Sequence, residues 1–155
     1  MTLAAAILQA ARARGWHIAT AESCTGGMVA AALTDIPGSS DVFDRGFVTY
    51  SNAAKVEMLG VTGASLVAHG AVSEEVAREM VLGARDAAGV ELAVAVTGIA
   101  GPGGSAAKPE GRVCFALASP AGIVTETVEF GARGRDGVRM AARDHALALL
   151  QAALS

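Results

Sequence analysis

The sequence predicts a three-layer α/β/α fold with a mixed β-sheet, and three observations favour this class. Stretches whose apolar residues recur at helical spacing alternate with short apolar runs through most of the chain, as in α/β domains. The run L-A-V-A-V-T at 92–97 is almost entirely apolar, which is typical of a strand covered on both faces. Near the end, two strand-like runs flank S-P-A-G, a pattern that predicts a late antiparallel hairpin.

The first part of the chain predicts helices and strands in alternation. Each predicted helix carries apolar residues on one side, and each predicted strand is a short apolar run. In order, these elements are a helix over 2–14, a strand over 16–21, a helix over 25–35, a strand over 46–50 and a short helix through Lys55 to Leu59. The P-G pair at 37–38 ends the second helix.

The second part begins with a loop, after which Ser73 can cap a helix that extends to Ala87. The remaining elements are a strand over 92–97, hairpin strands over 112–119 and 122–130, and a last helix over about 136–154. No repeat or linker interrupts this order. The 155 residues therefore predict one domain, 1–155, with enough interior for a hydrophobic core.

Composition limits the classes of function. Hydrophobic residues make up 52% of the chain and charged residues 17%, which argues against disorder. The formal net charge of -3 argues against a general nucleic-acid binder. No apolar run reaches about 18 residues, and Arg12 and Arg14 interrupt the first helix, so neither a membrane span nor a signal peptide is predicted. The high apolar fraction predicts a homodimer or larger assembly, because excess apolar surface must be covered.

The two cysteines, Cys24 and Cys114, have no C-x-x-C spacing, so the sequence indicates neither a zinc site nor a disulfide framework. A reduced, cytoplasmic protein without a metal site is the simplest interpretation.

Three predicted loops directly follow strands, at 22–27, 50–55 and 97–105. Ligands of open α/β sheets bind outside the carboxyl ends of the strands, so these loops are expected to converge on one crevice. Ser23 in the first loop is either a plain helix N-cap or a nucleophile whose oxyanion would face free N–H groups.

Three features bear on whether Ser23 acts as a nucleophile: the glycines that follow it, the neighbouring cysteine and the positions of the histidines. Gly26 and Gly27 leave room for a substrate. Cys24 competes for the role of nucleophile, because a thiol at a helix start is acidified. The histidines offer no obvious base, since they fall in a predicted strand, a loop and a distant helix; they are His17, His69 and His145.

Lysine is rare in this chain. Ten of the twelve basic residues are arginine, and only Lys55 and Lys108 are lysine. Arginine does not lose its proton in practice, whereas a buried lysine can. Lys55 is therefore a candidate base for a serine nucleophile, with Tyr50 to orient it or relay a proton. A surface lysine beside a half-buried tyrosine would explain the pair equally well. A short-chain dehydrogenase is excluded by the Tyr–Lys spacing and by the missing G-x-G-x-x-G.

The third loop, T-G-I-A-G-P-G-G, has too many glycines for a plain turn. Its backbone N–H groups could cradle an anion, although a mobile surface loop is the alternative. It is not a phosphate-binding loop of the Walker A type, because no G-K-[ST] ends it. Three arginines flank the start of the last helix and either bind a phosphate or form a solvated face; they are Arg133, Arg135 and Arg139.

Together these blocks resemble one family. A-E-S-C-T-G-G, G-F-V-T-Y-S-N-A-A-K, H-G-A-V-S, A-V-T-G-I-A-G-P-G-G and K-P-E-G-R-V are similar to the CinA C-terminal domain family, in the family's order and over nearly the whole chain. The enzymatic members are nicotinamide mononucleotide deamidases. The resemblance implies hydrolysis of the nicotinamide carboxamide to the acid and ammonia, without a metal or redox cofactor. The implied substrate is thus a small nucleotide, and neither nucleic acid nor membrane is an expected partner.

The resemblance also implies roles for individual residues. Ser23 corresponds to the family's nucleophile, Tyr50 and Lys55 to its partners, and Thr97 to a substrate-contacting threonine. For the family's arginine near the last helix we favour Arg139, with Arg135 next. The further candidate substrate-binding residues are Gly26, Gly27, Gly98 and Gly101. Glu110 stands where many relatives have an aliphatic residue.

Two other functions stay open at this point. One is a non-catalytic nucleotide-binding or regulatory domain that retains the pocket, and the other is an amidohydrolase for a different amide. The proximity of three side chains separates an enzyme from a binding domain: a hydrolase requires Ser23, Tyr50 and Lys55 to meet within hydrogen-bond reach.

Overall fold

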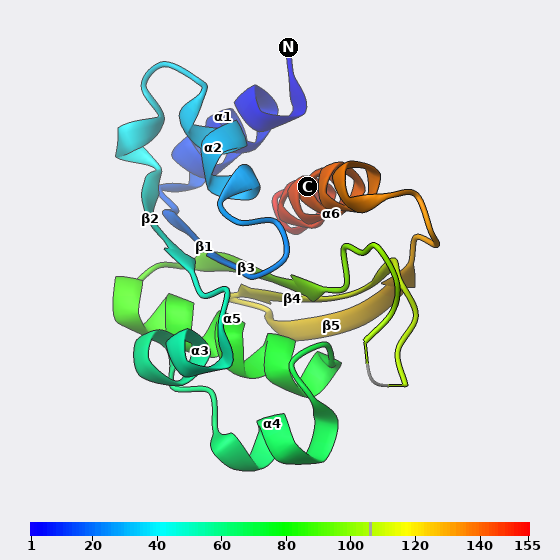
Figure 1. The fold of residues 1–155 in the computed structure, drawn as a ribbon. Coiled ribbons are helices and arrows are strands. Elements are labelled where there is room, and N and C mark those ends of the chain that lie inside the picture. Colours follow the sequence, from blue (N-terminus) through cyan, green and yellow to red (C-terminus); the bar gives the residue numbers. More distant parts are fainter. Residues whose placement is uncertain (106) are drawn as a thin grey trace.

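A computed structural model of the chain describes residues 1–105 and 107–155. Over these residues the chain forms one five-stranded sheet with helices on both faces (Figure 1). This arrangement confirms the predicted α/β/α layering. The strands are β1 (Ile18–Glu22), β2 (Phe43–Val48), β3 (Leu92–Gly98), β4 (Arg112–Ser119) and β5 (Gly122–Glu129).

The sheet is mixed, with the strand order β2-β1-β3-β4-β5. Strand β1 pairs in parallel with both β2 and β3, whereas β3, β4 and β5 pair antiparallel. The late antiparallel hairpin is therefore confirmed as β4–β5. Because β2, β1 and β3 run in the same direction, their carboxyl ends meet at one edge of the sheet, as the sequence predicts.

Helices cover both faces of the sheet (Figure 1). On one side lie α1 (Leu3–Arg14), α2 (Met28–Thr34) and α6 (Arg135–Ala153), and on the other lie α3 (Asn52–Leu59), α4 (Gly63–His69) and α5 (Glu74–Ala88). Alternate residues of β3 supply the two hydrophobic cores. Val94 and Val96 belong to the core under α1 and α6, and Ala93 and Ala95 to the core under α5.

Helix α3 approaches the backbone of α5 most tightly at Gly83. A Cβ atom added at Gly83 of α5 would come within 2.0 Å of the carbonyl oxygen of Leu59, a separation that real atoms do not adopt. Glycine at this position therefore lets the carboxyl end of α3 touch the backbone of α5. The position of α3 matters because Lys55 lies one turn before Leu59.

Helix α4 occupies a segment for which the sequence predicts a loop. It has only seven residues, none of them buried, and Val67 is 90% exposed. A helix without a buried stripe gives no apolar periodicity, so its signal is only the cap: the Thr62 hydroxyl accepts from the Ser65 amide at 3.1 Å. Within the described residues, no helix has both the length and the apolar character needed to cross a bilayer.

Strand β2 begins earlier and ends earlier than the predicted run 46–50. It covers Phe43–Val48, so Tyr50 follows the strand instead of ending it. The strand lies at an edge of the sheet, where polar residues such as Asp44 and Arg45 are tolerated and the apolar alternation is weak. The other boundaries differ from the predicted ones by a few residues, as is usual at element ends.

Candidate active site

The turn after β1 is organised by Glu22. Its carboxylate is 1% exposed and accepts the Thr25 hydroxyl at 2.6 Å and the amide N–H groups of Gly27, Val29 and Ala30 at 3.2, 2.9 and 3.0 Å. A carboxylate is stabilised at a helix N-terminus, because the first amides lack partners and carry partial positive charge. Glu22 thus ties the end of β1 to the start of α2.

Ser23 is not the N-cap of α2, since that position belongs to Gly27. The plain capping interpretation of Ser23 is therefore excluded. The sequence also suggested that free N–H groups at the helix start would face an oxyanion at Ser23. The Glu22 carboxylate already accepts three of these amides, so they are not free for this role. Glu22 was not among the predicted site residues, although the sequence carries a signal for its role: a lone acidic residue ends the buried strand, three positions before Thr25.

Ser23 and Lys55 form a buried pair. Ser23 is 8% exposed and Lys55, on α3, is 1% exposed. The Lys55 Nζ atom lies 3.0 Å from Ser23 Oγ, 2.9 Å from the Thr49 carbonyl oxygen and 3.3 Å from the Tyr50 carbonyl oxygen. Burial lowers the pKa of Lys55 below its ordinary value, because a charged amine loses its hydration in the interior.

The Ser23–Lys55 pair lies at the edge of the sheet where the carboxyl ends of the parallel strands β2, β1 and β3 form a row. The Ser23 amide donates to the Val96 carbonyl at 2.9 Å, and the Thr49 amide donates to the Glu22 carbonyl at 2.8 Å. These bonds extend the parallel ladder beyond the last paired residues of β1. Ser23 is consequently fixed in the middle of the row, between the segment after β2 and the end of β3.

Cys24 does not have the properties of a nucleophile. Its side chain is buried, and burial raises the pKa of the thiol to about 12. Helix α2 begins only at Met28, so the thiol is not at a helix start and is not acidified as the sequence suggested. The carbonyl oxygen of Cys24 accepts a hydrogen bond from Arg139 Nε at 3.0 Å.

Tyr50 contacts Lys55 through its backbone and not through its phenol. The side chain is 59% exposed, and its hydroxyl accepts from Arg135 Nη2 at 2.6 Å. Arg135 Nη1 also donates to the carbonyl oxygen of Gly101 at 2.8 Å. These contacts join the segment after β2, the glycine-rich loop and the first residue of α6.

A cavity of about 730 Å³ lies beside the Ser23–Lys55 pair. Of the predicted site residues, it is lined by Ser23, Tyr50, Lys55, Thr97, Gly98, Gly101 and Arg135. Its other charged or titratable lining residues are Cys24, His69 and Lys108, and no aspartate or glutamate is among the described lining residues. In a chain with a net charge of -3, such a lining favours an anionic ligand.

Three predicted site residues lie outside this lining. Gly26 and Gly27 form the turn behind Ser23, and Arg139 packs against it: a Cβ at Gly26 would be 3.2 Å from Arg139 Nη2. Arg139 therefore holds the turn through the Cys24 carbonyl.

Thr97 is 1% exposed, and its hydroxyl donates to the Ala71 carbonyl oxygen at 2.9 Å. Over residues 1–105 and 107–155, no group of three His, Cys, Asp or Glu side chains is placed to hold a metal ion.

Comparisons with known proteins agree on one family. The family model described as the CinA C-terminal domain matches residues 1–154. A protein named nicotinamide-nucleotide amidohydrolase PncC from Enterobacter agglomerans is 55% identical over 86% of this chain and 82% of its own length. A protein of the same name from Escherichia coli K12 is 52% identical over 97% of this chain and 92% of its own length. The crystal structure of competence/damage inducible protein CihA from Agrobacterium tumefaciens, 47% identical, superposes with a TM-score of 0.95 and covers 99% of this chain and 94% of that one.

Proposed function

The chain belongs to the CinA C-terminal domain family, and on this basis we propose that it hydrolyses the carboxamide of nicotinamide mononucleotide to nicotinate mononucleotide and ammonia. Relatives at 52–55% identity carry the name of that amidohydrolase. The observation that carries the proposal is the 3.0 Å contact between Ser23 Oγ and Lys55 Nζ. Burial of a lysine amine without a carboxylate partner costs stability, so a lysine at this position, in contact with a serine hydroxyl, favours a chemical role over a purely structural one.

The contacts of Lys55 suit a neutral amine. An amine has two N–H groups and one lone pair, and two carbonyl oxygens and one hydroxyl surround the Nζ atom. The two N–H groups donate to the backbone carbonyl oxygens of Thr49 and Tyr50. The lone pair is then free to accept the proton of the Ser23 hydroxyl. The cationic pyridinium ring of the substrate further disfavours a charged Lys55.

The proposed reaction has two halves. Ser23 Oγ attacks the carboxamide carbon while Lys55 accepts its proton, and the ammonium of Lys55 then protonates the amide nitrogen, which leaves as ammonia when the C–N bond breaks. A water molecule next attacks the ester on Ser23 while Lys55 accepts a proton from it. The ammonium of Lys55 then returns this proton to Ser23 Oγ as the ester C–O bond breaks, which releases the acid product and restores both side chains. Aligned acid–base help of this kind contributes about 10²- to 10⁴-fold to the rate.

Arg135 is the better-placed residue to bind the substrate phosphate. It lines the cavity, and its guanidinium faces the Tyr50 hydroxyl and the glycine-rich loop. Planar guanidinium groups bind phosphates with two parallel hydrogen bonds. Arg139, favoured from the sequence alone, is not among the described lining residues of the cavity, and its Nε atom donates to the Cys24 carbonyl, so we assign it to holding Ser23 in place. Thr97, Gly98 and Gly101 are proposed to shape the wall against the nicotinamide ring.

The proposal extends to assembly and location. Residues 1–155 act as one amidohydrolase domain in the cytoplasm, as a homodimer or larger assembly. Exposed apolar side chains between residues 48 and 58 support self-association: Val48, Tyr50, Val56 and Met58 are 47%, 59%, 42% and 47% exposed. Light scattering of the purified chain measures its mass, and a monomer at micromolar concentration would refute this part.

Ammonia release from purified protein tests the activity. We expect release from nicotinamide mononucleotide and a much lower rate from the riboside and from free nicotinamide, because both lack the phosphate that Arg135 would bind. An inactive protein that still binds the mononucleotide would favour the non-catalytic binding domain. Activity on another amide but not on nicotinamide mononucleotide would favour the alternative hydrolase.

A further inference from the structure

The proposed reaction places a negative charge on the carboxamide oxygen. As the bond from Ser23 Oγ to the carboxamide carbon forms and Lys55 takes the hydroxyl proton, the electron pair of the C=O π bond moves to that oxygen. Hydrogen-bond donors that face such an oxyanion supply a large part of the catalysis in acyl transfer. The new bond holds the carbon on Ser23 Oγ, so the backbone amides beside Ser23 are the donors nearest to this oxygen.

The hydrogen bonds of the turn that carries Ser23 account for most of its amides. The Ser23 amide donates to the Val96 carbonyl oxygen at 2.9 Å, and the Gly26 amide donates to the Ser23 carbonyl oxygen at 3.0 Å. The amides of the next four residues also have acceptors: Gly27, Val29 and Ala30 donate to the Glu22 carboxylate, and Met28 donates to the Thr25 carbonyl oxygen.

The amides of Cys24 and Thr25 are the exceptions in this turn. Neither has an acceptor in another residue within the described part of the chain, although both residues are buried. The Cys24 amide does lie near its own sulfur, which is a weak acceptor. Buried backbone N–H groups are nearly always paired, so two unused donors directly after the proposed nucleophile indicate a role.

We propose that the backbone amides of Cys24 and Thr25 form the oxyanion hole of the reaction. This inference rests on the proposed function. Cys24 lines the active-site cavity, and its amide nitrogen is bonded to the carbonyl carbon of Ser23, so it lies close to any carbon held on Ser23 Oγ. The amide of the residue after the nucleophile has this role in other serine hydrolases. The site needs only the backbone of residue 24, so Cys24→Ala retains it.

Glu22 is the positioning residue of this oxyanion hole. It precedes Ser23 directly, is 1% exposed, and accepts the Thr25 hydroxyl at 2.6 Å in addition to the three amides. The carboxylate thereby holds Thr25 and the start of α2 against the end of β1. Glutamine has the same shape but turns one acceptor oxygen into an NH2 group. Whichever way that amide is turned, its NH2 group faces a backbone N–H, so Glu22→Gln loosens the turn without emptying the interior.

An analogue of nicotinamide mononucleotide with an aldehyde in place of the carboxamide tests the oxyanion hole. Ser23 Oγ adds to the aldehyde carbon, Lys55 takes the hydroxyl proton, and the tetrahedral adduct keeps its oxyanion because it has no leaving group. In nuclear magnetic resonance spectra of the wild type, the amide protons of Cys24 and Thr25 should shift to low field on adduct formation, as donors to a charged acceptor do. Ser23→Ala, which cannot form the adduct, is the matched control and should not show these shifts.

Glu22→Gln tests the positioning role. It should lower kcat for the mononucleotide by about ten- to a hundredfold, the effect of a small misplacement, with little change in KM. The affinity for the aldehyde analogue should fall by a similar factor, because only the tetrahedral state uses the two amides. A partly unfolded variant would instead bind fewer equivalents of the analogue with unaltered affinity.

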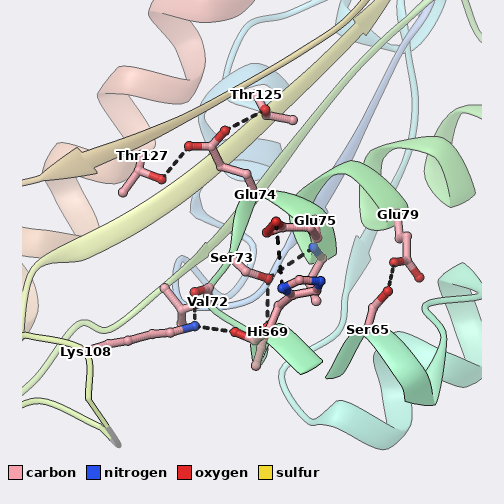
Figure 2. Close-up of polar contacts among 12 residues, drawn as sticks. Ser65, His69, Val72, Ser73, Glu74, Glu75, Glu79, Lys108, Thr125 and Thr127 are labelled. Carbon is pink, nitrogen blue, oxygen red and sulfur yellow. Dashed lines mark hydrogen bonds and ion pairs between the residues drawn. The ribbon is translucent and has the colours of Figure 1, made fainter. Parts of the chain in front are cut away.

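Glu74→Gln is the matched control for Glu22→Gln. Glu74 is also a carboxylate at a helix start, where it accepts the hydroxyls of Thr125 and Thr127 (Figure 2). It is not among the described residues that line the active-site cavity. Glu74→Gln should therefore keep the wild-type kcat and the wild-type affinity for the analogue.

The possible outcomes distinguish this inference from the proposed function. A wild type that releases no ammonia from the mononucleotide would refute the proposed function. An active wild type that forms no adduct would refute Ser23 as the nucleophile and the oxyanion hole with it. An adduct that shifts the amides of Ala100 or Gly101, which also line the cavity, but not that of Cys24 would move the oxyanion to the glycine-rich loop and overturn the inference. Unaltered kcat and analogue affinity in Glu22→Gln would refute the role of Glu22.

Discussion

The two ends of the cavity differ in how their side chains are held. At the inner end, Ser23 and Lys55 are buried, and the lysine is fixed by backbone carbonyls of the segment after β2. At the mouth, Tyr50 and Arg135 are exposed and hold each other. Backbone contacts fix a group in one geometry, whereas an exposed side-chain pair can exchange partners at little cost. The inner end suits chemistry, and the mouth suits binding and release.

The strongest test of this division is removal of the proposed nucleophile, Ser23. Ser23→Ala should lower kcat by about 10⁴- to 10⁶-fold, as in hydrolases that lose an attacking serine. Mononucleotide binding, measured by calorimetry, should persist because the mouth is intact. Cys24→Ala is the matched control and should keep most of the activity, since its thiol is protonated. An inactive Cys24→Ala beside an active Ser23→Ala would reverse the assignment.

The next test concerns Lys55, for which we propose a neutral amine. Lys55→Ala should lower kcat by about 10²- to 10⁴-fold, and Lys55→Arg should be equally inactive because a guanidinium does not give up its proton. Turnover measured at saturating substrate separates this effect from binding. A fully active arginine variant would show that a proton acceptor at position 55 is unnecessary.

A smaller effect is expected at the mouth. Arg135→Ala should raise KM by about ten- to a hundredfold, the value of a charge-assisted hydrogen bond, with kcat little changed. Arg139→Ala, in contrast, should mainly lower kcat, since it releases the turn that carries Ser23. Steady-state kinetics of the two variants side by side measure this contrast, and the reverse pattern would return the phosphate to Arg139.

The smallest effect is on stability. Burial lowers the pKa of Lys55 in the folded protein below the ordinary value of 10.5, which the unfolded chain keeps. At pH values between the folded and the unfolded pKa, the unfolded chain therefore binds one more proton than the folded chain. The free energy of unfolding should therefore rise with pH through that window, by at most about 1.4 kcal/mol per pH unit. Denaturant titrations of the wild type and Lys55→Met, compared across alkaline pH, measure this slope. Equal slopes would mean that Lys55 is charged in the folded protein.

The sequence predicted most of the fold because buried elements have a clear apolar period. The all-apolar run in β3 and the amphipathic helices α5 and α6 were recognised in this way. Helix α4 was not, because none of its residues is buried. The early start of β2 was hidden by Asp44 and Arg45, which an edge strand can expose.

The site was predictable where chemistry restricts the residue type. The proximity of Ser23 and Lys55 was expected from the need for a nucleophile and a titratable base in loops after parallel strands, and the 3.0 Å contact confirms the proximity, whereas their roles stay a proposal. The choice between Arg135 and Arg139 could not be made in this way, because the two lie four residues apart on the same face of α6. One helical turn decides which of them reaches the cavity, and only the packing of α6 sets that turn. Lys108 was noticed only for its rarity.

The glycine at position 83 controls, from a distance, where the proposed proton acceptor Lys55 lies. Any side chain there would push against the Leu59 backbone and lift the helix that carries the amine, and a displacement of about 1 Å can cost a hundredfold in rate. A methyl group added on the far side of α3 would thus slow the reaction about a hundredfold without touching the cavity, and a survey of variants by proximity to the substrate would overlook it.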